Sequence, residues 1–422
     1  MLKNQLFLES TKRIREIIES YSFLIDVRTK KNDFTRSGKL GFKNIIGIIL
    51  NFTKRSLQVE LNDFFKSVLG SSDRVRKQAF SQGRQKILFD AFIILIKELV
   101  KVVYTATDLK MYKGYRLLAV DGSTMELQNT EELRKVFGYA ENGKSEVARA
   151  KISGLYDIEN DIIIDATIDH YKTPERALAI KHIENLKEYG LNNNLVIFDR
   201  GYPSREFMAY FMDNKINFLM RFSKSYMKEL TTFEGNDATI SFDYNGKKYN
   251  IRIIKVSLDD GTVEILATTI FDESFTAEDF KILYFKRWGK EVKYNELKHR
   301  LQIENLGGVK EIIVKQDFYA MILISNLIAL AKMQSNEIIK DKDKEKGLKY
   351  EYKTNTNIAI GEFKNELISI IIEKNEQIRE SKYTVLLQRI SSYVTPIKPG
   401  RHNPRKFKVT RDRYPMNARR AL

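Results

Sequence analysis

Residues 115–123 read YRLLAVDGS, and this stretch decides the fold class. Its first six residues form a largely apolar run that predicts a buried β-strand, and the run ends directly in Asp121. Residues 195–198, LVIF, form a second buried run, which ends in Asp199. Because the carboxyl ends of neighbouring strands can meet at one edge of a sheet, we expect the two carboxylates to converge there. Taken alone, each aspartate also fits a turn or a helix cap.

The segments around these two runs alternate between strand and helix patterns, which is typical of an α/β protein. Residues 148–156 and 162–168 read as two further strands, and Pro174 lies in the first turn of a helix predicted to reach about residue 189. A helix is expected after Pro203, and a short strand at residues 218–221. The predicted order is therefore three early strands, a helix and then a central strand.

Residues 226–274 interrupt this alternation with three strand patterns separated by hairpin turn signals. The strands are expected at residues 239–242, 248–256 and 263–269. This part reads as a β-rich insertion, after which a helical pattern resumes at Thr276.

Residues 284–298 read YFKRWGKEVKYNELK and predict a helix, because Lys, Glu, Leu and Arg favour one and only a single Gly interrupts it. At 100° per residue, Tyr284, Arg287, Glu291 and Lys298 share one stripe. The apolar residues on the other side are expected to pack against the protein: Ile282, Leu283, Phe285, Val292 and Leu297. A lone carboxylate among cations suits a site that binds a metal ion together with a polyanion. The alternative is a solvated charged face.

The composition limits the partners and the metal chemistry. The chain has 422 residues, a formal net charge of +17 and a pI of about 9.5, which favours nucleic acid or another anionic surface as a partner. It has no cysteine and four scattered histidines, so a metal ion would bind carboxylates, as Mg²⁺ or Mn²⁺ does. Asp121, Asp199 and Glu291 together would suit two such ions at a phosphodiester.

Residues 1–105 read as a helical domain with a basic face. One interpretation is a small helical domain with a basic surface and no ligand. The other is a domain that binds DNA ends through Lys54, Arg55, Arg74, Arg76, Lys77, Arg84 and Lys86. No specific recognition motif is legible, so the sequence leaves both open.

Residues 341–422 read as a C-terminal helical region with a basic tail. The run DKDKEK at residues 341–346 predicts a solvated linker, and amphipathic helices are expected at 358–372 and 383–393. Residues 398–422 predict a disordered basic tail that gains order on DNA, and a solubilising tail is the alternative.

The N-terminus lacks the pattern of a signal peptide, and the most apolar segments are too short or too interrupted to span a bilayer. The sequence therefore predicts no membrane partner and a cytoplasmic, nucleoid-associated location.

Three motifs taken together resemble the DDE transposases of bacterial insertion sequences. They are Val120-Asp121-Gly122-Ser123, then Phe198-Asp199-Arg200-Gly201-Tyr202, then the Tyr-(2)-Arg-(3)-Glu-(6)-Lys spacing of Tyr284, Arg287, Glu291 and Lys298. The last spacing is the signature of the insertion-sequence-four group. The resemblance covers roughly residues 75–335, and no signature residue departs from the pattern.

The resemblance implies a ribonuclease-H-like catalytic core made of residues 106–225 and 275–340, with residues 226–274 inserted. Asp121 would lie on the first strand, Asp199 just after the fourth and Glu291 on the following helix, and the three would hold two Mg²⁺ ions, with Mn²⁺ as a possible substitute. The enzyme would cleave the terminal inverted repeats of its transposon and join the 3′-hydroxyl to target DNA. Synapsis of two ends implies a homodimer.

The same resemblance implies DNA contacts. Tyr284, Arg287 and Lys298 would grip phosphates of the transposon end. Some relatives pass through a DNA hairpin with a flipped base, and Trp288 could stack on such a base or simply pack. Arg200 and Tyr202, beside the second aspartate, would orient DNA or the surroundings of the metal.

Two other functions compete with an active transposase. A catalytically idle or domesticated transposase would bind DNA without turnover, although it would not need all three carboxylates. A related nuclease of the same fold would cleave without strand transfer. A stand-alone helix-turn-helix regulator would need no α/β core.

Overall fold

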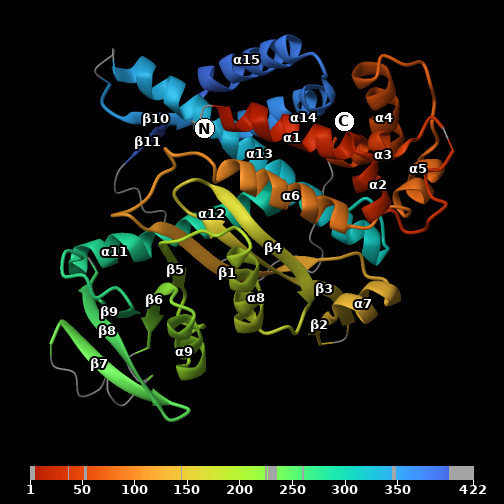
Figure 1. Cartoon of the computed structure of the whole chain (residues 1–422). Coiled ribbons are helices and arrows are strands. Elements are labelled where there is room, and N and C mark those ends of the chain that lie inside the picture. Colours follow the sequence, from red (N-terminus) through yellow and green to blue (C-terminus); the bar gives the residue numbers. More distant parts are fainter. Residues whose placement is uncertain are drawn as a thin grey trace.

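The computed structural model describes residues 5–36, 38–51, 55–143, 145–223, 226, 235–258, 261–344 and 348–398, and for residues 142, 288–291 and 344 it describes the backbone alone. The protein is a mixed α/β structure in which a central mixed sheet is surrounded by helices (Figure 1). The fold class predicted from the sequence, α/β, is therefore confirmed. The predicted basic tail lies outside the described residues, apart from Lys398.

The central part of the sheet consists of three antiparallel strands followed by two parallel ones. The first three are β1 (Arg116–Glu126), β3 (Ser145–Asp157) and β4 (Ile162–His170), with the short β2 (Tyr139–Asn142) paired to the start of β3. The other two, β5 (Asn194–Phe198) and β6 (Asn217–Phe222), run parallel to β1. The predicted order of three early strands, a helix and a central strand is confirmed.

Strand β1 is longer than the sequence predicted. Its parallel pairing with β5 ends at Ala119, but its antiparallel pairing with β3 continues through Asp121 to Glu126. Asp121 therefore lies within β1 and not after it. The polar residues that appeared to end the strand are tolerated because one edge of β1 is still paired there.

The predicted β-rich insertion extends the central sheet. Its strands are β7 (Asp237–Tyr244), β8 (Lys247–Ser257) and β9 (Val263–Thr268), and β9 pairs antiparallel with β6. Asn245 and Gly246 join β7 to β8 with positive φ angles of 48° and 74°, as a tight two-residue hairpin turn requires. In Figure 1 these strands form the green end of the sheet.

Three helices fix the faces of the sheet near the two aspartates. Helix α8 (Glu175–Lys187) contacts β1, β3 and β4, and α9 (Arg205–Asp213) begins after Ser204, whose side chain accepts a hydrogen bond from the Phe207 amide. On the opposite face of the same central strands, α11 (Ala277–Lys286) belongs to a separate apolar cluster. That cluster includes Leu117, Leu195, Ile197, Leu219, Phe280 and Leu283.

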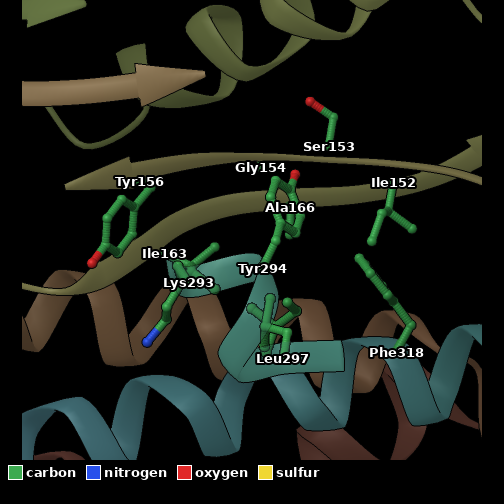
Figure 2. Close-up of a pocket in the computed structure, with 11 residues that line it drawn as sticks. Ile152, Ser153, Gly154, Tyr156, Ile163, Ala166, Lys293, Tyr294, Leu297 and Phe318 are labelled. Carbon is green, nitrogen blue, oxygen red and sulfur yellow. The ribbon is translucent and has the colours of Figure 1, made fainter. Parts of the chain in front are cut away.

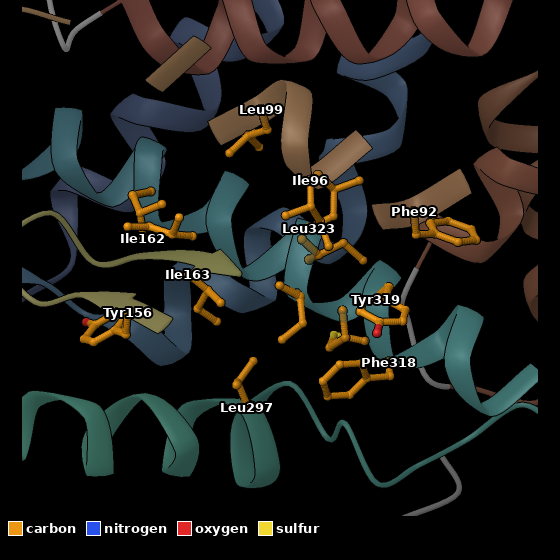
Figure 3. Packing of buried hydrophobic residues seen from close by; sticks show 14 of the residues in the cluster. Phe92, Ile96, Leu99, Tyr156, Ile162, Ile163, Leu297, Phe318, Tyr319 and Leu323 are labelled. Atoms are coloured by element: carbon orange, nitrogen blue, oxygen red, sulfur yellow. The ribbon is translucent and has the colours of Figure 1, made fainter. Parts of the chain in front are cut away.

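The long helix α13 (Glu311–Lys344) is the centre of the larger core. It packs against β4 and against α6 (Asp90–Val103), and Figure 3 shows Phe92, Ile96 and Leu99 of α6 facing Tyr319 and Leu323 of α13. By length and composition α13 could cross a membrane, but 83% of its most apolar 18-residue window is buried inside the protein. The predicted linker at residues 341–346 is wrong for 341–344, which continue this helix.

Helices from both ends of the chain pack on α13. They are α1 (Leu6–Glu19) from the N-terminal part, and α14 (Thr356–Ile372) and α15 (Glu376–Ser392) from the C-terminal part. Phe7 of α1 stacks on Tyr383 of α15 with ring centroids 4.2 Å apart. Other described helices are α2 (Tyr21–Val27), α3 (Phe42–Leu50), α4 (Leu57–Asp63), the π-helix η2 (Phe64–Val68), α5 (Lys77–Arg84) and α7 (Glu131–Phe137). The sequence did not predict a small sheet of β10 (Glu351–Thr354) and β11 (Val394–Ile397).

Among the basic residues considered for DNA binding in the N-terminal part, Arg84 is buried. Its guanidinium donates to Asp317 Oδ1 at 2.6 Å and to Gln316 Oε1 at 2.9 Å, both on α13. Arg55, Arg74, Arg76, Lys77 and Lys86 are exposed, and Lys54 lies outside the described residues. The expectation that Arg84 contacts DNA is wrong, because its charge is used to join the N-terminal helices to α13.

We predict that Arg84→Ala lowers the free energy of unfolding by about 3 kcal/mol, since it leaves Asp317 buried without its cation. Urea unfolding of the full-length protein measures this change. Lys86→Ala, which removes an exposed cation two residues away, should stay within about 0.5 kcal/mol of wild type. Equal stability of the two variants would contradict the structural role of Arg84.

Candidate active site

The register of two parallel strands brings Asp121 and Asp199 to the same level of the sheet. The paired residues of β1 and β5 run from Arg116 opposite Asn194 to Ala119 opposite Ile197. Asp121 and Asp199 each follow the last pair by two positions, and both aspartates are half-buried. Extending this pairing by two residues predicts that the two carboxylates point to the same side of the sheet.

The helical segment that carries Glu291 is divided into three parts. Helix α11 ends at Lys286, α12 (Trp288–Asn295) follows after Arg287, and the π-helix η3 (Glu296–Arg300) completes the segment. The sequence predicted one uninterrupted helix, which is wrong at Arg287 and after Asn295. The side chains of Glu291 and Trp288 lie outside the described residues, so only their backbone position in α12 is known.

Three side chains of this segment bond the strands that carry the aspartates. The Tyr284 hydroxyl donates to Asp199 Oδ1 at 3.3 Å, and the Tyr294 hydroxyl donates to the Asp121 carbonyl oxygen at 2.9 Å. The Lys298 ammonium donates to the Thr124 carbonyl of β1. The segment that contains Glu291 is thus tied to both aspartates, which places the backbone of all three acids in one region.

Tyr284 and Tyr294 are neutral donors in this region. Burial is the main cause that raises the pKa of Tyr284 to about 12, with Arg287 acting against it and Asp199 acting with it. Burial, Asp121 and Glu175 raise the pKa of Tyr294 well above its ordinary value. Both phenols therefore keep their protons at neutral pH and can donate hydrogen bonds to the strands.

The side of the helical segment 284–298 that packs against the protein differs from the side that the sequence predicted. Leu283 and Leu297 are buried as expected, but Ile282, Phe285 and Val292 are 40%, 44% and 63% exposed. The stripe of Tyr284, Arg287 and Lys298 turns toward the sheet, because carboxylates and backbone carbonyls at the ends of β1 and β5 offer it partners.

The predicted DNA contacts differ in accessibility. Arg287 is buried, with its guanidinium carbon 5.6 Å from the centre of the Tyr284 ring, and Lys298 is 20% exposed. Arg200 is exposed, whereas Tyr202 is buried under the turn that follows Asp199. Tyr202 therefore lies behind the surface at which DNA was expected to contact it, and for the others contact with DNA stays a prediction.

The first turn of α8 supports both aspartate segments, which the sequence analysis missed. Arg176 donates to the carbonyl oxygens of Gly201, Tyr202 and Pro203 at 3.2, 2.8 and 3.0 Å. The carboxylate of its neighbour Glu175 covers Gly122 so closely that a Cβ there would lie 2.6 Å from Glu175 Oε1. Any side chain at position 122 would therefore make the Glu175 side chain move away from Asp121.

A buried ionic network fixes the end of the Glu291 segment. Lys293 bonds Asp161 at 3.0 Å and Glu296 at 3.1 Å, and Lys332 of α13 bonds the same two carboxylates at 2.9 and 3.2 Å. The side chains of Lys293 and Glu296 are 4% and 7% exposed. Two cations and two carboxylates alternate, so each of these buried or half-buried charges has two partners of opposite sign.

Between β3 and this segment lies a cavity of about 20 Å³, which Figure 2 shows with Tyr294, Leu297 and Phe318 around it. Its lining is almost wholly apolar, and it has room for about one water molecule. It is a packing gap and not a substrate site.

The donor chemistry of the candidate site fits a hard divalent cation, since Asp121 and Asp199 supply carboxylate oxygens and the chain has no thiol. Among the side chains that the structure describes, no three carboxylates or histidines form a ready metal-binding group. The third expected ligand, Glu291, is outside that set.

The chain is similar to known transposases. Residues 112–327, about half of the chain, match the family described as Transposase DDE domain. The chain is 22% identical over 314 residues to the transposase InsG for insertion sequence element IS4 of Escherichia coli (strain K12), which covers 70% of each protein. A solved piggyBac transposase synaptic complex with hairpin DNA is similar at 11% identity and a TM-score of 0.46, over 91% of this chain and 84% of that one.

The family match and the insertion-sequence relative define a DNA transposase, an enzyme that cleaves and joins DNA with divalent metal ions. The chain belongs to the DDE transposases, in the insertion-sequence-four family, as its Tyr-Arg-Glu-Lys spacing predicted.

We predict that the ionic network makes stability depend on pH below neutrality. Burial alone would raise the pKa of Glu296, but Lys293 and Lys332 outweigh it and hold the pKa below its ordinary 4.5. A carboxylate with a lowered folded-state pKa stabilises the protein above its unfolded pKa and loses this contribution as pH falls through the folded-state value. Glu296→Gln should cost about 3 kcal/mol of unfolding free energy at pH 7, and the difference from wild type should shrink as the pH falls below the ordinary carboxyl pKa of 4.5.

Urea unfolding at several pH values measures this difference. Glu311→Gln is the control, because it removes an exposed carboxylate paired with a lysine at the start of α13, and such pairs contribute about 0–1 kcal/mol. A Glu296→Gln defect that stays constant from pH 7 to pH 3 would show that the network is not its origin.

We also predict that Tyr294→Phe slows DNA cleavage about fivefold to tenfold while DNA binding stays unchanged, because one hydrogen bond to the Asp121 carbonyl is worth about 1 kcal/mol. Cleavage rates and gel-shift affinities on the same terminal-repeat DNA measure both quantities. Tyr249→Phe, which removes a hydroxyl from β8 in the insertion, is the matched control. Full activity of Tyr294→Phe would mean that this bond does not help to position Asp121.

Proposed function

We propose that this transposase cleaves the terminal inverted repeats of its element with Asp121, Asp199 and Glu291, and that these residues hold two Mg²⁺ ions. The observation that carries the proposal is the register of β1 and β5, which puts both aspartates two residues beyond the last paired position. The three bonds from the Glu291 segment to these strands add support. When bound, the ions would polarise the scissile phosphate and activate a water or a 3′-hydroxyl.

A ribonuclease-H-like core is the fold that this proposal requires. In its favour, three antiparallel strands are followed by a helix and two parallel strands, with the first aspartate on β1, the second directly after β5 and the glutamate on a later helix. The division into residues 1–105, 106–225, 226–274, 275–340 and 341–422 belongs to the same proposal. A common core shared by the N-terminal helices, α13 and the C-terminal helices indicates that the first and last of these parts depend on the others.

Some residues at the site would position the aspartates, and others would contact DNA. Tyr284 orients the Asp199 carboxylate, and Tyr294 fixes the backbone of Asp121. Lys298 is close enough to the surface to reach a phosphate, and Arg200 is exposed beside Asp199. Arg287 would contact DNA only at the edge of its buried guanidinium, and Trp288 would stack a flipped base.

The partners would be the terminal inverted repeats and the target DNA, bound by two copies of the chain in the synaptic complex. The net charge of +17 supports a polyanionic partner. The corresponding location is the cytoplasm, on the nucleoid.

The test uses the full-length protein, DNA carrying the repeat of its own element, and Mg²⁺. We predict that Asp121→Asn, Asp199→Asn and Glu291→Gln each lower strand cleavage by at least a thousandfold, while binding to the repeat changes less than threefold, because phosphate contacts remain. Mn²⁺ should replace Mg²⁺, and EDTA should abolish cleavage.

Asp213→Asn is the control, since it changes an exposed aspartate at the end of α9. Wild-type cleavage by any of the three variants would remove that residue from the site. Tight binding of the repeat by the wild type, without cleavage in either metal, would instead favour a transposase that only binds DNA.

A further inference from the structure

A buried chain of three side chains ends on the backbone of Asp121. Asp165 of β4 lies 2.6 Å from His182 Nδ1, and His182 Nε2 lies 3.0 Å from the Ser153 Oγ of β3. The Ser153 hydroxyl in turn lies 3.1 Å from the Asp121 carbonyl oxygen. Ser153 and Tyr294 reach this oxygen from opposite sides of β3, as Figure 2 shows for the two side chains.

The order Ser, His, Asp is that of a hydrolase triad, but burial excludes a hydrolytic role. His182 is 0% and Ser153 2% exposed, so no substrate carbonyl can approach the hydroxyl. The small cavity beneath β3, which Ser153 and Tyr294 both border, is almost wholly apolar and has room for about one water molecule, so it admits no substrate. The chain of residues therefore acts on Asp121 and not on a substrate of its own.

The hydrogen-bond partners of His182 indicate how many protons its ring carries. The Asp121 carbonyl can only accept, so the single proton of Ser153 must point at it. His182 Nε2 must then carry a proton to donate to Ser153 Oγ. Nδ1 lies 2.6 Å from Asp165 Oδ2, which also accepts from the Asn185 amide at 3.0 Å, so a proton must lie between these two atoms as well, and a carboxylate partner places it on Nδ1. A neutral His182 would take the serine proton for itself and leave two acceptor oxygens facing each other at 3.1 Å.

We infer that His182 is an imidazolium in the folded protein, paired with the Asp165 carboxylate, and that it acts through Ser153 as a positioning residue for Asp121. The inference rests on the proposed role of Asp121 in cleavage. The imidazolium contacts Asp165 on β4 and Ser153 on β3. Asn185, which lies on α8 like His182, donates to the same Asp165 carboxylate. The fixed charge makes Ser153 a stronger donor, and with Tyr294 it holds the Asp121 carbonyl in one orientation.

The charge is tested by nuclear magnetic resonance on the full-length protein labelled with ¹⁵N-histidine at pH 7.5. The chain has only four histidines, and His182→Gln identifies the signal. We expect both ring nitrogens of His182 to be protonated, with the nitrogen shifts of an imidazolium. A ring with one unprotonated nitrogen would overturn the inference, whatever the activity of the protein.

The positioning role is tested by cleavage of terminal-repeat DNA. Ser153→Ala should lower the cleavage rate about tenfold with unchanged binding of the repeat, and Ser153→Thr, which keeps a hydroxyl, should restore most of the rate. Ser335→Ala is the control, since it removes a buried serine hydroxyl from α13 that bonds Thr354. A full rate in Ser153→Ala, or equal defects in the Ala and Thr variants, would overturn the role.

The two proposals fail separately. If Asp121→Asn cleaved like wild type, the proposed function of Asp121 would fall, and the nitrogen shifts would still decide the charge of His182. If Asp121→Asn is inactive and Ser153→Ala is fully active, the positioning role alone falls.

Discussion

The candidate site depends on one constraint, the register between β1 and β5. Parallel strands that pair from Arg116 with Asn194 to Ala119 with Ile197 must bring the next residues of the same face level with each other. A shift of one residue would direct one of the two aspartates to the opposite face. The apolar runs LLAV and LVIF, buried on both faces, specify this register because any slip would expose part of them.

The carbonyl oxygen of Asp121 accepts hydrogen bonds from side chains on both faces of the sheet. Tyr294 reaches it from the helical segment that carries Glu291, and Ser153 reaches it from the side of α8. β1 can extend past the end of β5 because β3 continues to pair with it. This part of β1 is thus paired with β3 alone among the strands, and side chains of the helical segment bond its backbone at Asp121 and Thr124.

The long helix α13 connects parts of the protein that are distant in sequence. It carries Lys332, which bonds Asp161 and Glu296, and it carries Asp317, which bonds Arg84 in the N-terminal helices. Arg84 and Gln316, which are 232 positions apart in the sequence, are hydrogen-bonded, and helices from both ends of the chain pack in the same core as α13. The N-terminal helices therefore belong to the same packed body as the site, and a charge that looked like a DNA contact in the sequence is a structural ion pair.

The sequence by itself determined the elements and the chemistry near the site. Apolar runs that end in aspartate specify strands through local burial, and the spacing of Tyr284, Arg287 and Lys298 specifies a helix face through the α-helical period. Which side of that helix packs was decided only by the tertiary structure. Ile282, Phe285 and Val292 are exposed because the ends of β1 and β5 offer partners to the polar side, and no local pattern contains that information. The contacts of His182 with Ser153 and Asp165, and of Lys293 with Asp161, were likewise decided by packing, since each joins residues from different elements whose proximity exists only in the folded chain.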